Sequence, residues 1–93
     1  MDLIWVLSRH KIVLPKEVSL DLVGAIPDLK VFFQVDYLDE QRIVKVVVRT
    51  VEGTFNIFSS GAIIINSRGI GENNLTANLD LIVSIMEKHL LKR

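Results

Sequence analysis

Side chains that could do chemistry are few in this 93-residue chain, and they are scattered along it. His10 and His89 lie far apart, and neither has a carboxylate or a second histidine at the spacing that metal ligands require. Ser59 and Ser60 have no general base within reach in the sequence, and Ser-Ser-Gly is ordinary turn chemistry. The absence of cysteine excludes disulfides, thiolate metal sites and cysteine nucleophiles. We therefore interpret both histidines as surface or rim residues, and we expect no catalytic residue, no metal, no cofactor and no enzyme activity.

Two further clusters have a functional and an ordinary interpretation. The glycine-containing loop at 69–74 precedes a predicted helix, as a phosphate-binding turn does. It lacks both a third glycine and a Gly-Lys-Ser/Thr ending, so a helix-entry loop is favoured. The acidic residues Asp36, Asp39 and Glu40 lie at a strand end and a turn. Carboxylates paired for acid–base catalysis need a pocket, so we interpret these three as solvated.

Composition and charge limit the function classes. The chain is 49% hydrophobic, which is enough for one core, and its length fits one domain spanning 1–93. No apolar run approaches the roughly 20 residues that cross a bilayer, and no targeting segment is visible, so we expect a cytoplasmic protein without membrane contact. The formal net charge is zero, whereas a domain that holds nucleic acid by charge alone is usually basic. Lys45 and Arg49 share one strand face, which is either a phosphate track or the polar side of an open sheet.

The first half of the chain predicts two strands around a short helix. Residues 3–14 form one strand, with or without an interruption, that ends at Pro15. Ser19 is the predicted N-cap of a short helix, which Pro27 ends because a proline disfavours helix at the residue before it. Residues 30–37 are rich in valine and phenylalanine and predict the second strand.

The second half predicts an antiparallel meander and a long helix. Strands at 42–51, 54–58 and 62–66 are joined by turns so short that neighbours must pair antiparallel. Alternation puts a uniformly apolar set on one face: Phe55, Ile57, Ile63 and Ile65. It puts a mixed set on the other: Asn56, Phe58, Ile64 and Asn66. The tail at 75–91 carries apolar residues at helical spacing, and they should cover the first face: Leu75, Leu79, Ile82, Val83, Met86 and Leu90. The fold class is α+β, with a curved antiparallel sheet of about five strands.

The sequence Thr-Phe-Asn-Ile-Phe-Ser-Ser-Gly-Ala-Ile-Ile-Ile-Asn at 54–66 resembles the strand–turn–strand signature of one repeat of the TATA-box-binding protein family. Ser-Leu-Asp-Leu at 19–22 resembles the start of that family's first helix. The order of elements is similar over nearly the whole chain, although the residue match is specific only at 54–66. The resemblance implies a half-saddle, with both helices on the convex face and nucleic acid or a partner on the concave face.

The sequence departs from the family pattern where the family contacts DNA. Each family repeat wedges two phenylalanines between bases, an established use of apolar side chains in bent minor grooves. Phe58 matches the second wedge, but the first falls near Gln41. A family lysine and a family arginine fall at Ala62 and Val47. The resemblance then leaves these residues as the nucleic-acid or partner face: Lys45, Arg49, Asn56, Phe58, Ile64 and Asn66.

Three functions are compatible with these observations. The first is a non-catalytic accessory module that acts by protein–protein contact in a DNA-processing assembly, in its most specific form a small subunit of an archaeal-type DNA polymerase holoenzyme. The second is a half-size minor-groove DNA-binding protein that homodimerises into a saddle through its first strand, where the interface residues are Leu3, Trp5 and Leu7. The third is a relative of the similar domains in one class of ribonuclease H and in DNA glycosylases. Weak DNA contact beside a protein partner lies between the first two.

Overall fold

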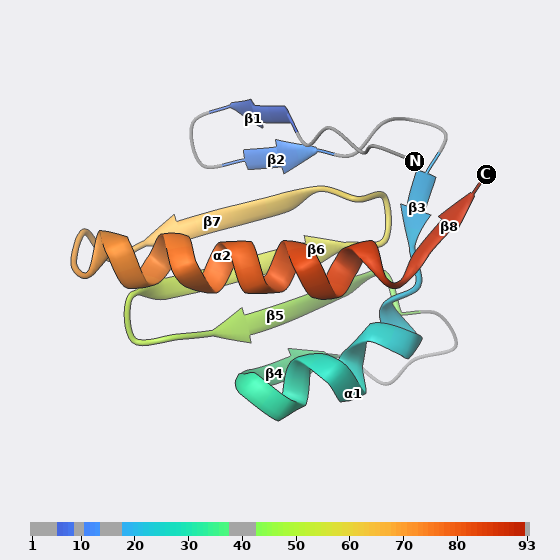
Figure 1. Ribbon diagram of the computed structural model, residues 1–93, viewed down its shortest axis with the longest axis horizontal. Coiled ribbons are helices and arrows are strands. Elements are labelled where there is room, and N and C mark those ends of the chain that lie inside the picture. The colour runs from blue at the N-terminus through green and yellow to red at the C-terminus, as the bar shows by residue number, and fades with distance from the viewer. Residues whose placement is uncertain (1–5, 9–10, 14–17, 38–42, 93) are drawn as a thin grey trace.

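The computed structural model describes residues 6–8, 11–13, 18–37 and 43–92, which form a sheet with two helices packed on one of its faces (Figure 1). The six-stranded antiparallel sheet has the order β1-β2-β7-β6-β5-β4, and β3 pairs with β8 in a separate two-stranded sheet. The strands are β1 (Val6–Ser8), β2 (Lys11–Val13), β3 (Val18–Leu20), β4 (Gln34–Tyr37), β5 (Lys45–Arg49), β6 (Gly53–Phe58), β7 (Ile63–Ser67) and β8 (Leu90–Lys92). The helices are α1 (Leu22–Phe32) and α2 (Glu72–Glu87). The predicted α+β class with a curved antiparallel sheet is confirmed.

The meander β5–β6–β7 follows the predicted alternation. Paired residues on the three strands form two rows. One row is Val48, Phe55 and Ile65, and the other, two residues away on each strand, is Val46, Ile57 and Ile63. All six side chains are buried. The residues between them in the sequence point to the other face, because successive side chains of a strand alternate.

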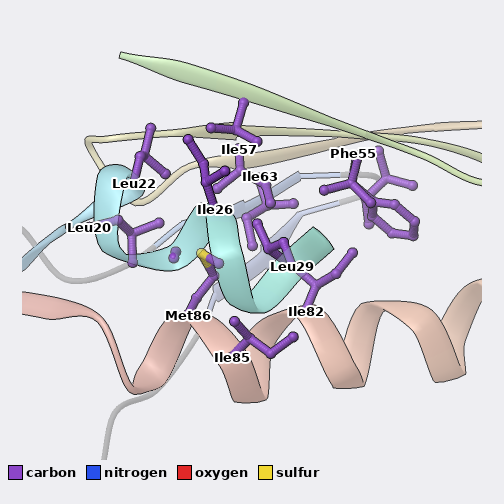
Figure 2. Close-up of a cluster of buried hydrophobic side chains, with 14 residues drawn as sticks. Leu20, Leu22, Ile26, Leu29, Phe55, Ile57, Ile63, Ile82, Ile85 and Met86 are labelled. Carbon is purple, nitrogen blue, oxygen red and sulfur yellow. The ribbon is translucent and has the colours of Figure 1, made fainter. Parts of the chain in front are cut away.

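Both helices close the core over this apolar face. Helix α1 contributes a buried side made of Leu22, Ala25, Ile26 and Leu29. Helix α2 contributes Ile82, Ile85 and Met86, and Figure 2 shows these side chains between the helices and the sheet. Ile85 was absent from the predicted helix face, whereas Leu75, Leu79, Val83 and Leu90 are only partly buried at its margin. No helix among the described residues is long and apolar enough to span a bilayer.

The prediction of one N-terminal strand was wrong, because that segment folds as a hairpin. Ser8 pairs directly with Lys11, and β1 and β2 run antiparallel. Ser8 and Lys11 belong to the polar stretch that separates the two apolar runs, and they pair with each other across the hairpin. The hairpin gives the sheet six strands rather than about five.

The predicted end of the first helix was also wrong. Asp21, not Ser19, is the N-cap of α1, and its Oδ1 accepts a hydrogen bond from the backbone N–H of Gly24 at 3.1 Å. The helix then passes through Pro27 and ends at Phe32, so the following strand starts at Gln34 rather than at residue 30. Burial of Leu29, two residues beyond the proline, explains the continuation, since tertiary packing overrides a local preference.

The C-terminal helix begins and ends earlier than the predicted range of 75–91. It starts at Glu72 after the helix-entry loop, where Gly71 adopts a left-handed conformation with φ of 62°. It ends at Glu87, and the last residues form β8 instead. The pairing of β8 with β3 explains this end, because Leu90 and Leu91 find backbone partners in Leu20 and Ser19.

Gly53, the first residue of β6, gives a test of the tight β6–β7 contact. A Cβ atom at this position would overlap the backbone carbonyl of Asn66. We expect Gly53→Ala to lower the free energy of unfolding by about 1–3 kcal/mol, the usual cost of overpacking. Chemical denaturation measures the loss, and Ser60→Ala in the next turn serves as the control, with an expected change within about 0.5 kcal/mol. Equal stability of the two variants would contradict the close strand contact.

Candidate functional site: the open face of the sheet

The face of the sheet opposite the helices is named here the open face. Strand register arranges its side chains in three rows. The first row is Gln34, Arg49, Thr54 and Asn66. The second row is Asp36, Val47, Asn56 and Ile64. The third row is Lys45 and Phe58. All ten residues sit on strands whose opposite face is fixed by the core, so the surface is rigidly positioned.

Phe58 is the aromatic residue of the open face. It is half-buried and lies directly across from Lys45 at the end of β6. The following turn holds its backbone on both sides: Phe58 N–H donates to the Ala62 carbonyl, and Gly61 N–H donates to the Phe58 carbonyl, both at 2.9 Å. Gly61 has φ of 96°, which only glycine adopts readily, so the Ser-Ser-Gly turn fixes where the ring lies.

The ten residues of the open face include two cations and one anion: Lys45, Arg49 and Asp36. Arg49 Nε forms an ion pair with Asp36 Oδ2, and both side chains are about half exposed. Such a surface pair contributes little to stability, but the Asp36 carboxylate offsets the positive charge of Arg49 that would attract a phosphate. Among the described residues of this face, Lys45 is then the cation that lacks an ion-pair partner. The geometry therefore favours the polar-face interpretation of Lys45 and Arg49 over a continuous phosphate track.

Four amide or hydroxyl side chains on the open face have hydrogen-bonding groups that no other described residue uses. Gln34, Thr54, Asn56 and Asn66 make no side-chain hydrogen bond to any other described residue. Asn56 is half-buried between the apolar neighbours of its row, so a bound group that offers donors and acceptors would satisfy it. Val47 and Ile64 flank Asn56 in the middle row, and Phe58 lies next to Asn56 on the same face at the end of β6.

The structure brings the predicted face residues together. Lys45, Arg49, Asn56, Phe58, Ile64 and Asn66 all lie on the open face. Sequence reasoning missed Gln34 and Thr54, and it did not foresee the ion pair of Asp36 with Arg49, although Asp36 remains about half exposed. The alternation of β4 was the signal that could have found Gln34. It was obscured because the predicted strand started at residue 30 rather than at Gln34.

Several predicted positions fall elsewhere. Leu7 lies in β1, the outermost strand at one edge of the six-stranded sheet. Leu3, Trp5, Gln41, Asp39, Glu40 and His10 lie outside the described residues.

His89 has a partner that its sequence neighbourhood did not reveal. Its Nε2 lies 2.6 Å from Asp28 Oδ2. No carboxylate stands at ligand spacing from His89 in the sequence, but the fold places one beside it, so the expectation of a histidine without a carboxylate was wrong. The contact joins α1 to the segment between α2 and β8. No group of three or more histidine, cysteine, aspartate or glutamate side chains is arranged to hold a metal ion in the described part of the chain. We interpret this pair as a structural contact that holds these two segments together.

Comparisons with known proteins add no relative: no protein-family model, no curated protein and no solved structure matches this chain. The functional argument therefore depends on the chain's own residues.

Adjacent residues on β6 test the assignment of the two faces. Ile57 is fully buried, and Ile57→Ala should lower the free energy of unfolding by about 2–5 kcal/mol, as large-to-small core changes do. Phe58 is half-buried on the open face, and Phe58→Ala should cost about 1 kcal/mol or less. Denaturation curves of both variants measure the difference. If Phe58→Ala destabilises the chain as much as Ile57→Ala does, the open face is not a surface.

Proposed function

We propose that this chain is a non-catalytic accessory module of a DNA-processing assembly and that it acts by protein–protein contact through the open face. The observation that supports the proposal is the combination on that face of an aromatic ring at the end of β6, amides without a hydrogen-bond partner among the described residues, and an arginine that is ion-paired with an aspartate. Protein interfaces have an apolar or aromatic centre with a polar rim, and aromatic side chains dominate their binding energy. Phe58 is the anchor in this proposal, and Asn56 is the polar group beside it.

Charge argues against DNA as the main ligand. Non-specific DNA affinity comes chiefly from lysine and arginine contacts to phosphates. The chain has zero formal net charge, and the Asp36 carboxylate lies beside Arg49 and offsets its charge. The DNA-facing lysine of the similar family is Ala62 here. Binding of a protein partner to the open face does not require the phosphate-contacting cations that this face lacks.

The choice of a DNA-processing assembly comes from the resemblance to the TATA-box-binding protein family. The order from α1 to α2 supports it, because a helix, the four strands β4 to β7 and a long helix follow each other as expected for one repeat of that family. The β1–β2 hairpin and the β3–β8 pair depart from that expected order. In its most specific form, the proposal is a small subunit of an archaeal-type DNA polymerase holoenzyme.

The second candidate is a half-size minor-groove binder that homodimerises into a saddle through its first strand. The observation that favours it is the position of β1, which pairs with β2 on one side and with no described strand on the other. An unpaired edge is a template for another strand.

Affinity purification from the native cell tests the main proposal. With the wild-type chain as bait, we expect DNA-replication or DNA-repair proteins to be enriched. Phe58→Ala should lose them, because it removes the proposed anchor. Ile70→Ala is the matched control, since Ile70 is 56% exposed in the loop before α2 and away from the open face. Equal recovery with wild type and Phe58→Ala would contradict the role of the open face.

A DNA titration separates the two candidates. For the isolated chain at about 150 mM salt we expect a Kd of roughly 10⁻⁴ M or weaker and no preference for TATA sequences, because non-specific binders reach roughly 10⁻⁴ to 10⁻⁶ M through phosphate contacts. Asp36→Asn releases Arg49 and should bind DNA more tightly than Asp80→Asn, an equal charge change on the exposed side of α2. Sub-micromolar binding by the wild type with a steep salt dependence would reject the accessory role and support the minor-groove binder.

A further inference from the structure

We draw no further inference here: the strongest candidate, the exposed apolar row of Val23, Pro27 and Val31 on the outer side of α1, carries none because nothing in the structure shows what covers this helix face.

Discussion

Burial of the apolar face of β5, β6 and β7 under the two helices is the constraint on which the rest of this structure depends. The chain has no disulfide, and the ion pair of Arg49 with Asp36 is at the surface, where such pairs contribute little. Fully burying one large aliphatic or aromatic side chain contributes about 1.5–3 kcal/mol before entropy is counted. Phe55, Ile57 and Ile63 are completely buried together with Ile82 and Met86 of α2. A one-residue slip of a strand would expose its whole apolar set, so the core also fixes the register.

The same register creates the surface that the proposed function uses. Because side chains alternate, each buried residue of β5–β7 sets the position of a neighbour on the open face. The backbone positions of Phe58, Asn56 and Arg49 are therefore fixed by the core, which lowers the entropic cost of recognition. Helix α1 completes the core with its inner side, which packs on the face of the sheet opposite the open face.

The sequence alone determined whatever depends on local pattern. Period-two alternation in the meander predicted which residues of β6 and β7 are buried, and short turns predicted antiparallel pairing. The six residues assigned to the open face, from Lys45 to Asn66, follow from that alternation and lie together in the structure. The helix-entry loop before α2 was likewise readable, because its glycines match no phosphate-binding fingerprint. These features are local, since each depends on residues only a few positions apart.

Only the tertiary structure decided the features in which distant segments compete with local preference. Core burial of Leu29 carries α1 through Pro27, although a proline alone predicts an end to the helix. Pairing with β3 takes the last residues out of α2 and into β8. The ion pair between Arg49 and Asp36 joins residues 13 positions apart, and the contact of His89 with Asp28 joins residues 61 apart. Neither pair has a sequence signature, because the energy of a side-chain contact depends on distance in space and not on separation along the chain.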